Sequence, residues 1–204
     1  MDTVKLSVRE LVEFVYKSGD INVKAISAER ALEGVKAHKL LQSNMGKGYH
    51  KEYYLKREFE FNSITFVIEG RADGIIEESD QTTVDEIKST YTNLDLIDDG
   101  YNIAHLAQVK CYAYIYGLDK ELNELNVQLR YFNLDTGKTK TFIYAYTLQE
   151  LEEFFYSLLN MYVDWAQTII NLRKEREKTV DELEFPSLNT DRDKEIFLLQ
   201  YSGQ

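Results

Sequence analysis

Two carboxylates and a lysine lie close together in the sequence, within residues 70–90. Asp73 ends the segment G-R-A-D, and Glu86 and Lys88 belong to the segment D-E-I-K. Because successive side chains of a strand point to opposite faces, Glu86 and Lys88 project from one face and Asp85 from the other. The turn residues S-D-Q-T separate the two segments. A hairpin of this length can bring Asp73 beside Glu86.

Such a pair of carboxylates needs something to relieve its repulsion. At about 4 Å the repulsion is about 4 kcal/mol at an effective dielectric of about 20, so a proton, a cation or open water must offset it. Mg²⁺ prefers oxygen ligands and few protein contacts, which this group of side chains provides. The alternative is an ordinary cross-strand salt bridge, the simpler interpretation of an isolated Glu-x-Lys on a strand.

A predicted helix over residues 28–43 carries a glycine and a histidine one turn apart. Gly34 and His38 form the pattern G-x-x-x-H. A glycine within a helix costs about 1 kcal/mol relative to alanine, which indicates that another element approaches it closely. His38 is either a packed or solvated residue or a metal ligand.

A second predicted helix, over residues 103–117, carries one polar stripe. The stripe consists of His105, Gln108, Tyr112 and Tyr116. It is either a surface stripe or the wall of a cleft whose amide and hydroxyl groups contact a phosphate backbone.

Capping boxes mark the start of two further helices. Ser7 with Glu10 begins a helix that ends near residue 19, and Thr147 with Glu150 begins a long helix to about residue 183. In the helix over residues 28–43, the apolar periodicity predicts a buried side formed by Leu32, Val35 and Leu40.

Alternating apolar and polar residues predict strands over residues 52–61, 64–78 and 83–89, and a hairpin over residues 126–147. The first two strands join at Asn62-Ser63, and the hairpin turns at Asp135-Thr136-Gly137. The order of elements is helix, three strands, helix, two strands, helix. It predicts an α/β fold, in which a central mixed sheet is flanked by helices.

The composition fits one globular domain. The chain has 204 residues and a net charge of −11, which by itself argues against a nucleic-acid partner. Residues 36–57 differ, since this segment contains six basic residues and one acidic residue, Glu52, and so has a net charge of +5. Lys47 and Lys51 lie there among tyrosines and histidines, a combination that can hold phosphates and stack bases. The alternative is a solvated basic face beside a tyrosine-rich strand.

Several classes of protein and site are disfavoured by the sequence. A single cysteine, Cys111, excludes an internal disulfide and a four-cysteine metal site, and it favours a reducing cytoplasmic location. No apolar run is long enough to span a bilayer, so we expect no membrane association. The first residues lack the pattern of a signal peptide.

Taken in order, G-x-x-x-H, G-R-A-D, D-E-I-K and Q-V-K-C-Y resemble the motifs of the PD-(D/E)XK nuclease superfamily. The resemblance is to its RecB-like branch, which includes CRISPR-associated RecB-like exonucleases and the nuclease domains of helicase-nucleases. It implies a restriction-endonuclease-like core with His38, Asp73, Glu86 and the carbonyl of Ile87 as metal ligands, and Lys88 as the catalytic lysine. The family pattern assigns site-ordering and DNA contacts to Gln108 and Tyr112, near His105.

The implied activity is a DNA nuclease, most simply an exodeoxyribonuclease in repair, recombination or defence, that uses Mg²⁺ or Mn²⁺. Several relatives carry a four-cysteine iron–sulfur cluster, which one cysteine cannot form, so we expect none here. Residues 1–185 form the nuclease domain, and residues 186–204, beginning at the only proline, resemble a tail or linker toward a helicase. Two alternatives remain: a catalytically silent DNA-binding or assembly module, and a nuclease domain that is active only with a partner helicase.

Overall fold

A computed structural model describes residues 2–16, 28–78 and 81–182. The chain divides into two units, Met1–Ala166 and Gln167–Gln204. Within the described residues, the first unit contains the sheet and the site discussed below, and the second contains the end of the last helix. The elements, in chain order, are β1 (Asp2–Ser7), α1 (Val8–Tyr16), α2 (Ala28–Ser43), β2 (Tyr49–Phe61), β3 (Ile64–Glu77), β4 (Thr82–Thr90), the short 3₁₀ helix η1 (Leu94–Leu96), α3 (Ile103–Lys120), β5 (Glu124–Asn133), β6 (Thr139–Thr147) and α4 (Leu148–Glu182).

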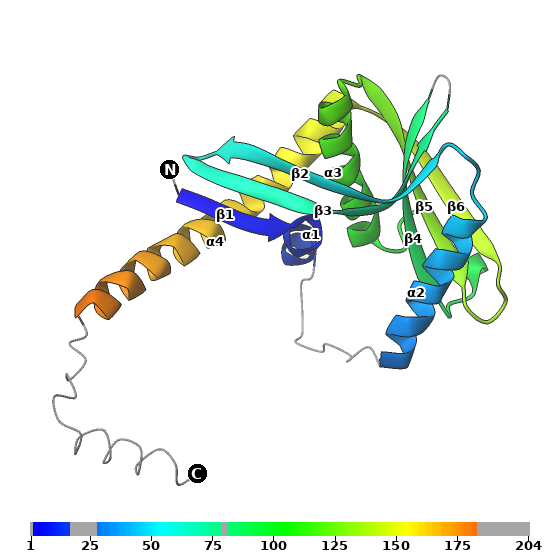
Figure 1. Cartoon of the computed structure of the whole chain (residues 1–204), viewed down its shortest axis with the longest axis horizontal. Helices are drawn as coiled ribbons and strands as arrows, with labels where there is room; N and C mark the ends of the chain where they lie inside the picture. The colour runs from blue at the N-terminus through cyan, green and yellow to red at the C-terminus, as the bar shows by residue number, and fades with distance from the viewer. Residues whose placement is uncertain (1, 17–27, 79–80, 183–204) are drawn as a thin grey trace, which may run out of the picture. The chain divides into compact units, whose positions relative to one another are not determined.

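The predicted α/β architecture is confirmed. Six strands of the described part of the chain form one mixed sheet in the order β1-β3-β4-β5-β6, with β2 paired to β3. β1 runs parallel to β3 and β4 parallel to β5, while the remaining pairs are antiparallel. In Figure 1, β2 and β3 extend together away from the part of the sheet that β4, β5 and β6 form.

The two edges of β3 are used differently. β2 pairs with one edge from Ile64 to Ile76 except at Asp73, whereas β1 and β4 share the other edge. β1 pairs with Ile64–Glu69, and β4 pairs only with Gly74–Glu77. Residues 70–73, the segment G-R-A-D, therefore lie in a gap between two strand partners. β1 was not predicted, because only the helix that follows it was recognised.

The helix starts follow from local hydrogen bonds. The Ser7 backbone N–H donates to Glu10 (2.6 Å), and the Glu10 N–H donates to the Ser7 hydroxyl (3.1 Å). Thr147 and Glu150 form the same reciprocal pair at the start of α4, at 2.8 Å and 3.2 Å. Both predicted capping boxes are confirmed. They satisfy backbone donors that have no partner within the helix.

The two predicted turns are also confirmed. Asn62 and Ser63 both have positive φ, 48° and 62°, as a tight type I′ hairpin requires. Gly137 has φ 67° in the β5–β6 hairpin, a conformation that glycine adopts without strain.

Helix α2 has the predicted bounds but not the predicted buried face. Leu32, Val35 and Leu40 are 60%, 51% and 51% exposed. Ala37 and Gln42 are buried instead. The helix contacts β4 through small and polar groups, and a Cβ on Gly34 would lie 3.2 Å from the Ser89 hydroxyl oxygen. Apolar periodicity predicted the helix correctly but not its orientation, because polar contacts dock this helix.

The main core lies between the sheet and helices α1, α3 and α4. Its largest fully buried side chains are aromatic, among them Tyr114, Phe66 and Phe155. Tyr131 is also buried, in a smaller cluster with Ile97 and Leu129. Among the described residues, no helix is both long and apolar enough to cross a membrane. The predicted tail, residues 186–204, lies outside the described residues.

Candidate active site

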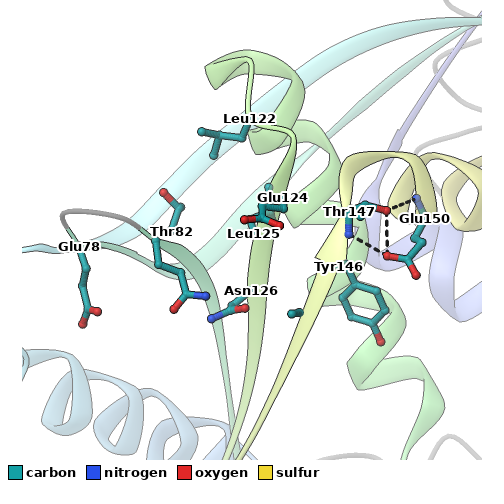
Figure 2. A pocket seen from close by; sticks show the side chains of 11 residues that line it. Glu78, Thr82, Leu122, Glu124, Leu125, Asn126, Tyr146, Thr147 and Glu150 are labelled. Carbon is teal, nitrogen blue, oxygen red and sulfur yellow. Dashed lines mark hydrogen bonds between the residues drawn. The ribbon is translucent and has the colours of Figure 1, made fainter.

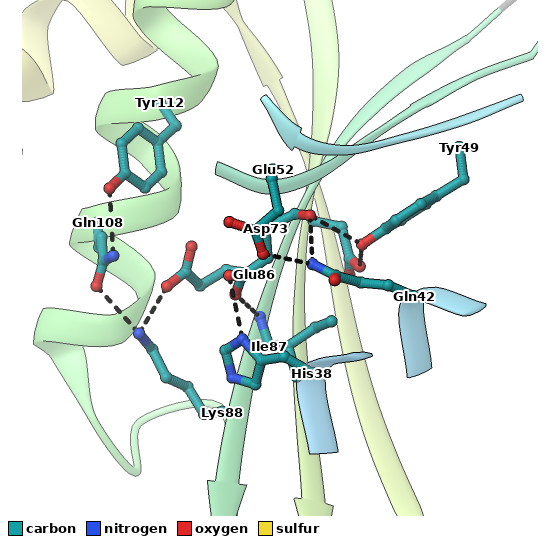
Figure 3. Close-up of polar contacts among 11 residues, drawn as sticks. His38, Gln42, Tyr49, Glu52, Asp73, Glu86, Ile87, Lys88, Gln108 and Tyr112 are labelled. Carbon is teal, nitrogen blue, oxygen red and sulfur yellow. Dashed lines mark hydrogen bonds and ion pairs between the residues drawn. The ribbon is translucent and has the colours of Figure 1, made fainter. Parts of the chain in front are cut away.

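The candidate site lies where β3 and β4 separate. Gly74 and Asp85 are the last paired residues of the two strands, so Asp73 and Glu86 occupy the first positions beyond the ladder. There the Asp73 side chain takes over the ladder's role, since its Oδ2 accepts the Ile87 backbone N–H at 2.7 Å. The predicted proximity of these two acids is thus present, at a fork in the sheet (Figure 3).

Glu86 is a buried carboxylate with one unsatisfied oxygen. Its residue is 2% exposed, and its Oε1 accepts a bond from Lys88 Nζ at 2.6 Å. Its Oε2 is buried and has no hydrogen-bond partner. Burial raises the pKa of Glu86 to about 7, against the lowering by Lys88, and the charge of Asp73 adds to the rise. An unpartnered buried carboxylate oxygen is costly, which indicates that this oxygen has a use not met by the protein itself.

His38 reaches Asp73 from helix α2. Its Nδ1 lies 3.2 Å from Oδ1 of Asp73. Burial lowers the pKa of His38, but the hydrogen bond and charge of Asp73 outweigh this and raise it overall. The structure thus brings together three of the predicted residues, His38, Asp73 and Glu86, from α2, β3 and β4.

Lys88 is held from two sides. Besides Glu86, its Nζ donates to Oε1 of Gln108 on α3 at 3.1 Å. The Gln108 amide lies 3.4 Å from the Tyr112 hydroxyl, and Tyr112 packs directly against the backbone of Gly70. A Cβ at Gly70 would lie 2.8 Å from the Tyr112 ring, so this contact requires glycine. The Q-x-x-x-Y and G-R-A-D segments therefore touch in the gap between β1 and β4.

The stripe on α3 is not a surface stripe. Tyr112 and Tyr116 are buried, and the Tyr116 hydroxyl donates to Glu77. His105 lies 3.0 Å from the Tyr131 hydroxyl. Burial, with the charges of Lys88 and Arg9, lowers the pKa of His105 to about 3. The stripe packs toward the sheet rather than lining an open wall along its whole length.

Of the predicted basic residues, Lys51 lies close to this cluster in the sheet, since it pairs with Gly74, next to Asp73. Lys47 precedes β2 and Lys51 lies on it, and both side chains are exposed. In the described part of the chain, no hydrogen bond or ion pair links either lysine to Asp73 or Glu86. Arg57, at the end of the same basic segment, pairs with Asp119 at 2.6 Å.

Several polar residues near the site were not recognised as such in the sequence. Gln42 donates to the Asp73 backbone carbonyl at 2.9 Å, and the Tyr49 hydroxyl donates to Asp85 at 2.9 Å. Asp85 also accepts from Gln128 (2.7 Å) and pairs with Arg130 (3.2 Å). Only the spacing of Gln42, one helical turn after His38, could have pointed to it.

The donor set fits a divalent cation, although no complete cluster is formed. Among the residues described, no group of three or more His, Cys, Asp or Glu side chains is arranged to hold a metal. His38 Nδ1 nevertheless lies 3.2 Å from Asp73 Oδ1, so two potential ligand atoms are adjacent. Glu86 adds an unpartnered oxygen, but its other oxygen is bonded to Lys88.

One cavity lies beside this cluster, and a second cavity lies away from it. One of about 400 Å³ is lined by Lys88, Gln108, His105 and Arg9, and so leaves room beside the lysine. Another, of about 430 Å³, is distant (Figure 2). The distant cavity is lined by none of the predicted site residues, and its Glu150 is engaged in the α4 capping box.

Comparisons with known proteins agree with this geometry. The model of the PD-(D/E)XK nuclease superfamily matches residues 8–191. The fold is similar to the crystal structure of SSO0001, with a TM-score of 0.52 and 21% sequence identity, over 77% of this chain and 76% of that chain. No curated protein sequence matches the chain. The family match covers most of the chain and all four of its motif segments, and the chain belongs to the PD-(D/E)XK nuclease superfamily.

Proposed function

We propose that the chain is a divalent-metal-dependent DNA nuclease, and that it acts as an exodeoxyribonuclease of the RecB-like branch in DNA repair, recombination or defence. The observation that carries the proposal is the buried, unpartnered Oε2 of Glu86, next to Asp73 at the fork between β3 and β4. Membership of a nuclease superfamily supports the same chemistry.

The proposed metal ligands are His38, Asp73, Glu86 and the carbonyl of Ile87. A bound Mg²⁺ or Mn²⁺ would lower the pKa of a water and polarise the scissile phosphate. Two acids lie in a mostly buried position, and their mutual repulsion favours the binding of a cation between them.

Lys88 is the proposed catalytic lysine. Glu86 and Gln108 hold its ammonium group at 2.6 Å and 3.1 Å, and its side chain is 23% exposed. In this position it would orient the attacking water or help to remove its proton. It would also offset the negative charge that develops on the phosphate in the transition state.

The substrate would approach from the side of the cavity beside Lys88. Lys47 and Lys51 are proposed DNA contacts, because both are exposed in the basic segment of residues 36–57. Gln108, Tyr112 and His105 are proposed to order the site from α3. We further propose that residues 1–185 form the nuclease domain and residues 186–204 a tail, and that the single cysteine fits a reducing cytoplasmic setting without an iron–sulfur cluster.

The test is cleavage of end-labelled single- and double-stranded DNA with Mg²⁺, Mn²⁺ or EDTA. Wild type should cleave only with metal. Lys88→Ala should lose about 100- to 1,000-fold in rate, as expected when a group that stabilises transition-state charge is removed. Glu86→Ala should also lose cleavage, because it removes a proposed metal ligand. Lys138→Ala, a change at an exposed lysine in the β5–β6 hairpin, is the matched control and should remain active.

The same experiment separates the alternatives. A silent DNA-binding module would bind DNA without cleavage under every metal condition. A domain that depends on a helicase would gain activity when that helicase is added. Equal cleavage by wild type and Glu86→Ala would contradict the proposed site.

A further inference from the structure

Strand β2 is irregular at one residue, directly opposite Asp73. Every residue of β2 from Tyr49 to Phe61 has a partner on β3 except Glu52. Its neighbours Lys51 and Tyr53 pair with Gly74 and Ala72, so Glu52 faces Asp73. Glu52 has φ 53°, a left-handed conformation that is uncommon for a residue with a side chain. Asp73 therefore has no backbone pairing partner in β2 or in β4.

Gln42 occupies the place of that partner. Its side-chain amide has two N–H groups: one donates to the Asp73 backbone carbonyl at 2.9 Å, and the other to Oε1 of Glu52 at 3.0 Å. Gln42 is 7% exposed, so these bonds are largely shielded from water. Figure 3 shows Gln42 reaching between Glu52 and the Asp73 backbone.

The bond from Gln42 to the Asp73 carbonyl also connects α2 to the candidate metal ligands. Gln42 follows His38 by four residues, so both side chains lie on one face of the helix. His38 contacts the Asp73 carboxylate and Gln42 contacts the Asp73 carbonyl. Because Leu32, Val35 and Leu40 of α2 are exposed, these polar contacts contribute to its docking, together with the buried Ala37 and the contacts of Glu33 and Arg30 with Tyr91.

Tyr49 approaches the same carbonyl from β2. Its hydroxyl donates to Oδ2 of Asp85 at 2.9 Å and lies 3.3 Å from the Asp73 carbonyl oxygen. The ring crosses the backbone of Gly74, where an added Cβ would lie only 2.1 Å from it. The glycine after Asp73 thus lets the tyrosine link the Asp73 backbone to the buried Asp85.

We propose that Gln42 is a positioning residue for the metal site, supported by Tyr49. By holding the Asp73 carbonyl where the strand ladder is interrupted, Gln42 fixes the Asp73 carboxylate relative to His38 and Glu86. Gln42 bonds the backbone of a proposed ligand residue rather than its carboxylate. Groups that orient metal ligands commonly change metal affinity about 10- to 100-fold when mutated. The inference rests on the proposed function, because it assumes a metal at Asp73.

The experiment measures Mn²⁺ binding by isothermal titration calorimetry without DNA, alongside cleavage as a function of Mn²⁺ concentration. Gln42→Met keeps the volume of the side chain but removes both donors, and Tyr49→Phe removes only the hydroxyl. Each should raise the Mn²⁺ dissociation constant, by about 10- to 100-fold for Gln42→Met. The Mn²⁺ concentration for half-maximal cleavage should rise in parallel, and saturating Mn²⁺ should restore the rate.

Two matched controls make the same chemical changes elsewhere. The Gln149 amide donates to Glu153 at 3.0 Å on the exposed side of α4, and the Tyr54 hydroxyl of β2 donates to Glu69 of β3 at 2.8 Å. Gln149→Met and Tyr54→Phe should leave Mn²⁺ affinity unchanged. If Gln42→Met does not fold, Tyr49→Phe decides the question.

The outcomes separate the inference from the proposed function. Wild type that binds no Mn²⁺ would overturn the proposed metal site itself. Wild type that binds Mn²⁺, with Gln42→Met and Tyr49→Phe binding it equally well, would overturn the positioning role alone. Lower stability of these variants with unchanged Mn²⁺ affinity would likewise make Gln42 and Tyr49 merely structural.

Discussion

Asp85 and Glu86 are adjacent on β4 and both are buried, yet their surroundings differ. Oδ1 of Asp85 accepts from Gln128, and its Oδ2 accepts from Tyr49 and pairs with Arg130. Glu86 has one bonded oxygen and one without a partner. Since they point to opposite faces of the sheet, one strand carries a satisfied carboxylate on one side and an incompletely satisfied one on the other.

This difference distinguishes an acid that the fold itself satisfies from the acid that we propose binds a metal. Burial raises the pKa of both side chains, but the charge of Arg130 and two hydrogen bonds oppose the rise at Asp85. Asp85 is thus a charge whose compensation is built into the fold. Glu86 keeps one oxygen without a partner and lies near a second acid, Asp73, which is an arrangement that a cation can complete.

The largest expected difference is in stability without metal. Asp85→Ala leaves Arg130, whose side chain is 12% exposed, without its carboxylate partner. Removing one member of a buried ion pair costs about 3–5 kcal/mol in free energy of unfolding. Urea unfolding of metal-free protein should therefore show a much lower midpoint for Asp85→Ala.

Glu86→Gln is the counterpart on the other face. It should be about as stable as wild type without metal, because it replaces an acid that burial disfavours in its charged form. A Glu86→Gln variant as unstable as Asp85→Ala would show that both acids are structural, and the comparison would fail.

The sequence predicted the fold and the meeting of Asp73 with Glu86 because both depend on local patterns. Strand alternation and a hairpin of suitable length place these acids near each other without knowledge of the rest of the chain. β1 was missed because its six residues precede a stronger helix signal, and its partner is distant in sequence, on β3.

The supporting contacts of the site could not be predicted in the same way. Gln42 meets Asp73 and Glu52 only because β2 departs from its ladder at Glu52, and no residue type there requires this. The exposure of Leu32 on α2 has a similar origin, since polar contacts rather than apolar periodicity orient that helix. The role of each predicted site residue stays a prediction.

A bound cation should stabilise the folded protein through Glu86. If Mn²⁺ binds only the folded state, it stabilises by about 2.7 kcal/mol at 100 times its dissociation constant. Thermal unfolding with and without Mn²⁺ should show this increase for wild type, its loss in Glu86→Gln and its reversal by EDTA. Glu69→Gln changes an exposed glutamate that accepts from Tyr54, and it should keep the full increase. An equal increase in Glu86→Gln would place the ion elsewhere.

The smallest expected effect concerns His105, which lies on α3 and within the electrostatic reach of Lys88. Burial and neighbouring positive charges lower its pKa from 6.5 to about 3 in the folded protein. Between these values the unfolded chain binds a proton that the folded chain does not, so stability falls as pH decreases below about 6.5. One proton corresponds to at most about 1.4 kcal/mol per pH unit. Urea unfolding at pH 7 and pH 5 should therefore show a smaller loss for His105→Gln than for wild type. Equal losses in wild type and His105→Gln would mean that His105 is charged in the folded state at pH 5.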